Sequence, residues 1–112
     1  KHSARTLVEK CDFISTVGWG NGDPEARAKL GFPGGGPKYC ITPLCVMEFD
    51  EESKSMRLLS LHPGVELEEV VVNTGFPIII PEELIYTERP TEEELEILRT
   101  RVDRAGVLRS EL

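Results

Sequence analysis

The sequence has few aromatic residues, no long apolar run and too few basic residues to balance its acidic ones. Its longest apolar runs are a few residues, such as Ile78–Ile80, so no segment could cross a bilayer as a helix. Twenty acidic residues against 13 basic ones give a net charge of −7, which argues against nucleic acid and anionic membrane surfaces as partners. No charged and apolar leader opens the chain, so we expect a cytoplasmic protein without a secretory signal.

The three cysteines are too few, and odd in number, for a disulfide framework. Cys40 and Cys45 are five positions apart on an expected strand, so they should point to opposite faces and could not hold a zinc ion together. We expect Cys11 to be a small core residue. His2 and His62 are sixty residues apart with no ligand pair nearby. These patterns predict no metal site and three thiols in a reducing compartment.

The 112 residues suffice for one domain over positions 1–112 with a single core. Their charge is uneven, because residues 1–47 carry six basic and four acidic side chains and residues 48–112 carry seven and sixteen. The plain interpretation is that the second part contains exposed helices with charged faces. The alternative is that the more basic first part faces an anionic partner.

The hydrophobic pattern predicts short elements in the order strand, glycine-rich loop, two strands, helix, strand and helix. A strand from Lys38 to Asp50 is apolar on both faces, with Pro43 favouring a bulge or an edge position. A second strand, 56–61, should run antiparallel to it after a polar turn at 51–55. The other expected elements are a strand at 13–17, a helix at 67–74 that Gly75 ends, and a buried strand at 76–81. Together they predict an α/β fold with a mixed sheet.

Two helix starts carry clear signals. Thr91 and Glu94 match a capping box before an apolar stripe. Asp23 stands directly before Pro24, which predicts the start of a short helical turn, and Gly31 should close that turn in a left-handed conformation.

Glycine is concentrated in residues 18–37, which hold seven of the ten glycines. The run Gly34–Pro37 leads into a strand rather than a helix, so it is not a phosphate-binding loop of the strand–loop–helix kind. Such loops either let backbone N–H groups approach a ligand closely or make tight turns without any ligand. The residues by themselves favour the tight turns.

No catalytic group can be assigned from the residues. None of the serines lies in a nucleophile elbow, and most glutamates lie in solvated runs. Glu48 is the one glutamate on an expected strand in apolar surroundings, and exposure at the strand end explains it more simply. His62 before Pro63 fits a turn better than a catalytic role. Trp19 stands between two glycines, where it could either cover a ligand or interface, or anchor its own loop.

Four segments together resemble the family I coenzyme A transferases, and within them the C-terminal half of the β subunit of the glutaconate CoA-transferase type. The resemblance spans about residues 4–104. It is carried most specifically by the Leu-His-Pro-Gly-Val and Asn-Thr-Gly-Phe blocks. The four segments are Val8–Thr16, Gly34–Thr42, Met56–Val65 and Glu68–Phe76.

The resemblance implies part of a three-layer α/β fold of the CoA-transferase type that works with an α-type subunit. In such enzymes a glutamate attacks an acyl-CoA thioester, and a glutamyl-CoA intermediate then passes the coenzyme A to a second carboxylic acid. That glutamate lies in the N-terminal half of the β subunit, and no glutamate here matches it. The resemblance therefore implies no catalytic residue in this chain, and coenzyme A as a substrate rather than a cofactor.

We expect the glycine-rich loops to form the wall of a site that other segments complete. One alternative is an acyl-CoA hydrolase or decarboxylase on the same scaffold, and another is an α/β interaction module without catalysis. The expected substrate- or CoA-binding residues are Ser15, Gly18, Trp19, Gly20, Gly34, Gly35 and Gly36.

Overall fold

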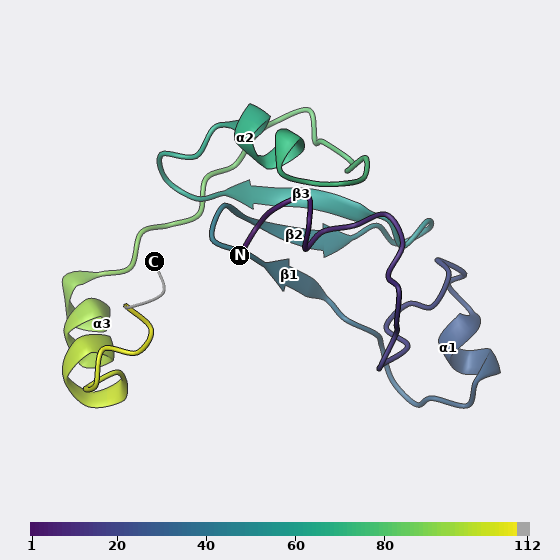
Figure 1. Ribbon diagram of the computed structural model, residues 1–112, viewed down its shortest axis with the longest axis horizontal. Coiled ribbons are helices and arrows are strands. Elements are labelled where there is room, and N and C mark those ends of the chain that lie inside the picture. The colour runs from purple at the N-terminus through teal and green to yellow at the C-terminus, as the bar shows by residue number, and fades with distance from the viewer. Residues whose placement is uncertain (110–112) are drawn as a thin grey trace.

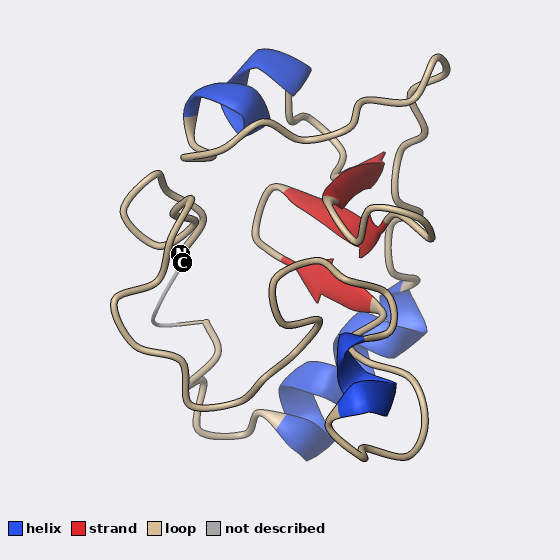
Figure 2. Ribbon diagram, turned by 90° about the vertical axis from the view of Figure 1, so that its right-hand side faces the viewer, coloured by secondary structure: helices blue, strands red, loops and turns tan. Residues whose placement is uncertain are grey.

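A three-stranded antiparallel sheet in the order β1-β2-β3 lies at the centre of the computed structural model, which describes residues 1–109 (Figure 1). Helix α2 covers one side of the sheet, while α1 and α3 lie at opposite ends of the molecule (Figure 1). Loops make up most of the chain (Figure 2). In chain order the elements are α1 Ala26–Lys29, β1 Tyr39–Ile41, β2 Cys45–Phe49, β3 Met56–Leu61, α2 Leu67–Val72, α3 Glu92–Ile97 and the π-helical turn η1 Leu98–Val102.

The segment 38–50 folds as a hairpin, so the expectation of one continuous strand was wrong. Thr42 ends the first arm, where its N–H donates to the Cys45 carbonyl at 3.0 Å, and Pro43 lies in the turn. In the turn Pro43 removes no ladder hydrogen bond, which explains why it is tolerated there. The Thr42 hydroxyl accepts the N–H groups of Leu44 and Cys45, at 3.2 and 3.1 Å. A threonine before proline thus completes a turn that alternation alone did not reveal.

The strand at 56–61 was predicted correctly and pairs antiparallel with β2 as β3. The polar turn before it is also confirmed, because the Asp50 carboxylate accepts the N–H and the hydroxyl of Ser53 at 2.9 and 2.8 Å. A bulge between Val46 and Met47 shifts the register of the β2–β3 pair.

The core is small. Among residues 1–109 its fully buried members are five side chains from β2, β3 and α2: Cys45, Met47, Leu58, Leu61 and Val70. Burying one large aliphatic side chain contributes about 1.5–3 kcal/mol. With only five such side chains, the core has little burial free energy to offset the conformational entropy that the whole chain loses on folding.

Three expectations for the N-terminal half were wrong or only partly right. Residues 13–17 form no strand, and Phe13 is 84% exposed, because no neighbouring strand pairs with them among residues 1–109. Cys11 is exposed rather than in the core. Cys40 and Cys45 lie on different arms of the hairpin, and Cys40 packs against the core that contains Cys45, so they do not point to opposite faces of one strand.

The short helix α1 forms where it was predicted. The Asp23 carboxylate accepts the N–H of Glu25 at 2.9 Å, and the helix itself begins a little later, at Ala26. Gly31 follows with φ +76°, as its expected left-handed conformation requires.

The segment 76–81 forms no strand of its own, although its backbone lies along the outer edge of β3. The Leu58 N–H donates to Ile79 O and the Ile79 N–H donates to Met56 O, both at 2.9 Å, in a single parallel bridge. A second parallel bridge joins Leu61 to Tyr86. The sheet itself is wholly antiparallel, so the expected mixed sheet is not seen within residues 1–109, and the parallel contacts are isolated bridges that close the β3 edge.

Helix α2 confirms the helix expected from residue 67, yet Gly75 does not end it through a left-handed turn. The φ of Gly75 is not positive, and the helix ends at Val72 with Asn73 as its C-cap. A Cβ on Gly75 would lie 2.5 Å from the carbonyl oxygen of Leu7, and the Gly75 N–H donates to that oxygen at 2.8 Å. The glycine is required for close packing of two backbones rather than for a helix cap.

Helix α3 and η1 form an arm that extends from the sheet on the linker after Tyr86 (Figure 1). The predicted capping box is present: Glu94 N–H donates to the Thr91 hydroxyl at 3.2 Å, and Thr91 N–H donates to the Glu94 carboxylate at 2.7 Å. The arm gives the molecule a radius of gyration of 16.5 Å, against about 13 Å for a compact domain of this length. No helix among the described residues is long and apolar enough to span a membrane.

Candidate functional site

Trp19 joins the two glycine-rich loops. Its indole Nε1–H donates to the Pro37 carbonyl at 2.8 Å, and the ammonium group of Lys54 lies 4.5 Å from the ring centroid. A Cβ on Gly36 would lie only 2.7 Å from the indole, so a side chain at this position does not fit. These contacts favour Trp19 as an anchor for its own loops, the second of the two interpretations that the sequence left open.

A cleft of about 590 Å³ opens beside this anchor. Trp19, Gly35 and Gly36 form one wall, and the end of the β2–β3 hairpin forms the other. Three of the seven expected binding residues therefore line one cavity. This arrangement agrees with the prediction that the two glycine-rich loops form one wall of a site. Binding of a ligand there stays a prediction.

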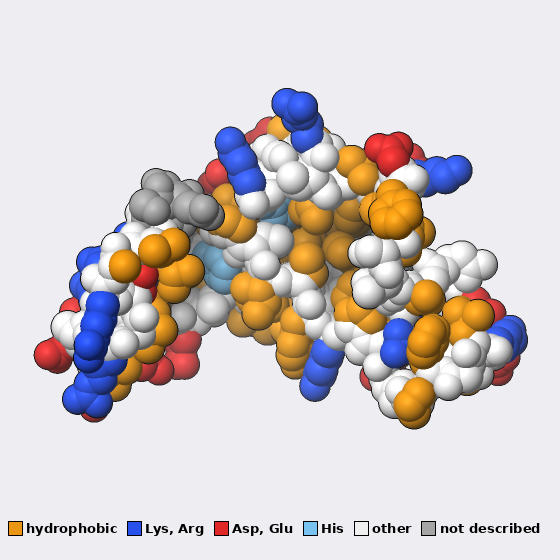
Figure 3. All heavy atoms as spheres, turned by 60° about the horizontal axis from the view of Figure 1, so that its bottom comes forward, with side chains coloured by type: hydrophobic (Ala, Val, Ile, Leu, Met, Phe, Trp, Pro, Cys, Tyr) orange, Lys and Arg blue, Asp and Glu red, His pale blue; other side chains and the backbone are white. Residues whose placement is uncertain are grey.

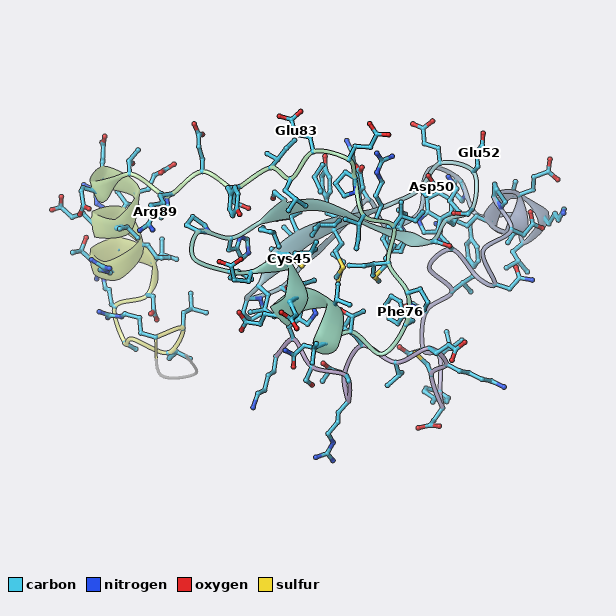
Figure 4. The ribbon with its side chains drawn as sticks, turned by 90° about the horizontal axis from the view of Figure 1, so that it is seen from above. Cys45, Asp50, Glu52, Phe76, Glu83 and Arg89 are labelled. Atoms are coloured by element: carbon cyan, nitrogen blue, oxygen red, sulfur yellow. The ribbon has the colours of Figure 1, made fainter. Side chains whose placement is uncertain are left out.

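The opposite wall of the cleft is acidic, which the sequence reasoning missed. It carries the carboxylates of Glu48, Asp50, Glu51 and Glu52, against the cations Lys38 and Arg57. Hydrogen bonds from the backbone and hydroxyl of Ser53 lower the pKa of Asp50, so this group stays ionised near neutral pH. Figure 4 places Asp50 and Glu52 at the end of the sheet that faces α1. The strand register would have revealed this wall, since Glu48 pairs with Tyr39 on β1 and with Arg57 on β3.

A smaller pocket of about 300 Å³ contains Ser15 and Gly18, two further expected residues. Arg27 lines it as well, donating from Nη1 to the Gly18 carbonyl at 2.8 Å and lying over the Phe32 ring. The Nε of Arg27 is buried and has no hydrogen-bond partner within residues 1–109. Gly20 and Gly34 line neither cavity; both have positive φ and serve the turns of their loops.

The two histidines, far apart in sequence, meet at Thr42. His62 Nε2 lies 2.9 Å from the Thr42 carbonyl, which can only accept, so Nε2 carries the proton. His62 Nδ1 forms a hydrogen bond with the Thr87 hydroxyl at 3.0 Å, and this hydroxyl forms another with the Ser60 hydroxyl at 2.7 Å. His62 is thereby held by both ring nitrogens, which fits the structural role expected for it.

His2 joins the other side of Thr42. Its Nδ1 lies 2.9 Å from the Thr42 hydroxyl, and its Nε2 lies 3.0 Å from the hydroxyl of Thr74. The Thr74 hydroxyl donates to the Val70 carbonyl, so His2 Nε2 must donate to Thr74, while the Thr42 hydroxyl donates to the Cys45 carbonyl at 3.1 Å. Burial lowers the pKa of His2, which favours the neutral ring. The network ties the N-terminal segment to the hairpin turn and to the end of α2.

Cys40 and Cys45 offer no activated nucleophile. Burial raises the pKa of both the Cys40 and the Cys45 thiols, which keeps them protonated. Cys11 is exposed but lines neither cavity. Within residues 1–109 no group of three or more histidine, cysteine or acidic side chains is arranged to hold a metal ion.

The chain is similar in sequence to subunits of two CoA-transferases and of a ring-cleaving hydrolase, although no family model matches it. It is 48% identical over 99 residues to the B subunit of the 3-oxoadipate CoA-transferase from Pseudomonas knackmussii, which covers 88% of this chain and 38% of that protein. It is 32% identical to the B subunit of the glutaconate CoA-transferase from Acidaminococcus fermentans, over 92% of this chain and 38% of that one. The cholesterol ring-cleaving hydrolase IpdB subunit of Rhodococcus jostii is also 32% identical, with 92% of this chain and 40% of that protein covered.

Comparison with solved structures gives the same result as the sequence comparison. The glutaconate coenzyme A-transferase of Acidaminococcus fermentans matches 96% of this chain with a TM-score of 0.83 and 30% identity, and IpdAB of Rhodococcus jostii matches all of it with a TM-score of 0.79 and 32% identity. The decarboxylase AibA/AibB, at 24% identity and a TM-score of 0.73, shares the fold. The expected fold class is thereby confirmed.

The chain spans about two fifths of the length of these relatives. Both the sequence and the fold of the described residues match over nearly the whole chain. The resemblance found in the sequence is confirmed: this chain is homologous to a part of the B subunit of the CoA-transferases.

Proposed function

We propose that the chain is the C-terminal portion of a CoA-transferase B subunit, which moves coenzyme A from an acyl-CoA thioester to a carboxylic acid. The observation that carries this proposal is the 48% identity to the B subunit of a 3-oxoadipate CoA-transferase over 88% of the chain. The partners would be an α-type subunit and the N-terminal half of the β subunit. Coenzyme A is a substrate in this proposal, and the chain needs no cofactor of its own.

The proposed chemistry runs through a glutamate outside these 112 residues. Its carboxylate attacks the thioester carbonyl, expels the CoA thiolate and leaves an acyl-glutamyl anhydride. The thiolate then attacks the glutamyl carbonyl, which releases the first acid and forms glutamyl-CoA. The second acid repeats these steps in reverse and leaves as its CoA ester. Backbone N–H donors stabilise the oxyanions that form.

The role proposed for this chain is to supply one wall of the substrate cleft. Glycines at 35 and 36 leave backbone exposed beside Trp19, where an uncharged part of an acyl-CoA can lie close to the chain. The carboxylates of Asp50, Glu51 and Glu52 would repel the CoA phosphates at the opposite wall. We therefore place the phosphates away from the β2–β3 turn.

Hydrolysis of an acyl-CoA is the second candidate, because the IpdB subunit, which is 32% identical over 92% of the chain, is also named as part of a hydrolase, one that cleaves cholesterol rings. The two functions differ in what they need. A transferase consumes acyl-CoA only when an acceptor acid is present, whereas a hydrolase releases free coenzyme A without one.

The test uses this chain assembled with the rest of its B subunit and an α-type subunit. We expect acyl-CoA consumption that depends on added carboxylic acid and, with acyl-CoA alone, a CoA adduct on a peptide outside the 112 residues in the mass spectrum. Free coenzyme A without an acceptor would favour hydrolysis. No turnover in the complete assembly would favour an interaction module without catalysis.

A further inference from the structure

The two edges of the sheet differ. The outer edge of β3 is closed by the chain itself, through the bridges to Ile79 and Tyr86. Within residues 1–109 the outer edge of β1 has no such cover, since β1 pairs only with β2 there. An open edge presents backbone groups that readily pair with another strand.

The register shows which backbone groups are open. Thr42 donates its N–H to Cys45, so these two residues form a hydrogen-bonded pair next to the turn. In an antiparallel ladder such pairs alternate, which makes Cys40 and Met47 the next one. The N–H and C=O groups of Tyr39 and Ile41 therefore point away from β2, and they have no partner among residues 1–109.

The side chains of β1 are equally uncovered. Tyr39 is 48% exposed and Ile41 is 72% exposed, while Cys40 between them faces the core. Figure 3 shows apolar side chains gathered on this face, between the arm that carries α3 and the lobe that carries α1. Apolar side chains beside unpaired backbone form a surface that is suited to a strand and not to water.

We propose that β1 continues the sheet into the rest of the B subunit, by pairing with an extended segment from the three fifths of that subunit that this chain does not match. The inference rests on the proposed function only in that it takes the chain as part of such a subunit. Three observations carry it: the chain spans only about two fifths of its relatives' length, the β1 edge is open, and the β3 edge is already closed.

A second copy of this chain fits the edge less well. Each copy carries a net charge of −7, so two copies repel each other. β1 is also only three residues long, so pairing β1 with β1 adds few hydrogen bonds to offset that repulsion.

The test measures amide hydrogen exchange in the isotope-labelled chain, alone and mixed with the unmatched segment of the B subunit from Pseudomonas knackmussii. We expect the Tyr39 and Ile41 amides to exchange at least about tenfold more slowly in the mixture. The Cys40 amide, already bonded to β2, should change less. The two segments of the Pseudomonas subunit, expressed separately and recombined, show that the added segment is competent to associate.

Ile41→Pro and Ile41→Ala form a matched pair for the same mixture. Both remove the exposed side chain, but only proline removes the outward N–H, and proline is tolerated at an open strand edge. We expect Ile41→Pro to weaken association about tenfold relative to Ile41→Ala. Equal affinities of the two variants would overturn the proposal.

Three other results would overturn it: unchanged exchange at Tyr39 and Ile41 in a formed complex, no association while the Pseudomonas control associates, or protection that comes with a dimer of the 12.5 kDa chain alone. Transferase activity is measured separately. Protected amides without turnover would support the strand pairing and contradict the proposed function, and turnover without protection would do the opposite.

Discussion

At Gly36 the absence of a side chain allows the two glycine-rich loops to meet. An alanine Cβ would lie 2.7 Å from the indole of Trp19, so the ring or the loop would have to move. We expect Gly36→Ala to lower the free energy of unfolding by about 1–3 kcal/mol, measured by urea denaturation. Gly35→Ala is the matched control: it meets nothing within 4 Å and should stay within about 0.5 kcal/mol. Equal effects at the two positions would contradict the anchor role of Trp19.

His2 should make stability depend on pH. Burial lowers the pKa of His2 from its ordinary value of 6.5, so the unfolded chain binds the proton more readily than the folded one. Its contribution is therefore fully present above pH 6.5 and is lost as the pH falls toward the folded-state pKa. The groups that face it are Thr42, Thr74, the carboxylate of Glu69 on α2 and the amino group of Lys1.

The measurement is the urea midpoint from pH 7.5 down to pH 5. We expect a steeper decline in the parent chain than in His2→Asn, whose amide cannot titrate in this range. Identical slopes would show that protonation of His2 is not coupled to folding.

At the scale of the element, α3 depends on its capping box because it packs little against the sheet. Thr91→Ala removes the hydroxyl that accepts the Glu94 N–H, which costs about 1 kcal/mol in typical helices. We expect a measurable loss of helix signal in circular dichroism. Thr100→Ala is the control, since its hydroxyl only donates back to the Glu96 carbonyl within the same arm. A larger loss from Thr100→Ala would contradict the capping role.

The elements that sequence reasoning found are those with local signals. The capping box, Gly31 and the turn that begins at Asp50 are all formed by residues within a few positions of one another. The strand expected at 13–17 failed because it has no partner strand within residues 1–109. The one expected at 76–81 failed because it meets β3 through a single bridge only. Neither outcome can be recognised within the segment alone. The expectation of one continuous strand over 38–50 failed for a different reason. Apolar residues on both faces hid the turn at Pro43 that divides the segment into a hairpin.

The candidate site also has one part that the sequence pointed to and one part that it did not. The concentration of glycines pointed to a segment of which Trp19, Gly35 and Gly36 line the cleft, and ligand binding by these residues stays a prediction. The acidic wall was missed because it depends on the register between β2 and β3, which composition does not reveal.

At the scale of the molecule, the small core makes the stability of the fold sensitive to the truncation of a single buried side chain. Leu61 is fully buried, and Leu61→Ala should cost about 2–5 kcal/mol, a large share of the stability of a typical domain. We expect a strongly lowered urea midpoint or an unfolded chain. Ile80→Ala, at a side chain that is 45% exposed, should cost less than half as much. Similar losses at both positions would show that the core extends beyond these five residues.

The close contact between Gly75 and Leu7 also gives a criterion for recognising other chains with this backbone arrangement from their sequences. A Cβ at position 75 would overlap the Leu7 carbonyl and approach the Ala4 carbonyl at 3.3 Å. Any sequence that keeps this backbone crossing must therefore keep glycine at the equivalent of position 75. A sequence with a larger residue there must route its N-terminal segment along a different path, whatever its overall identity.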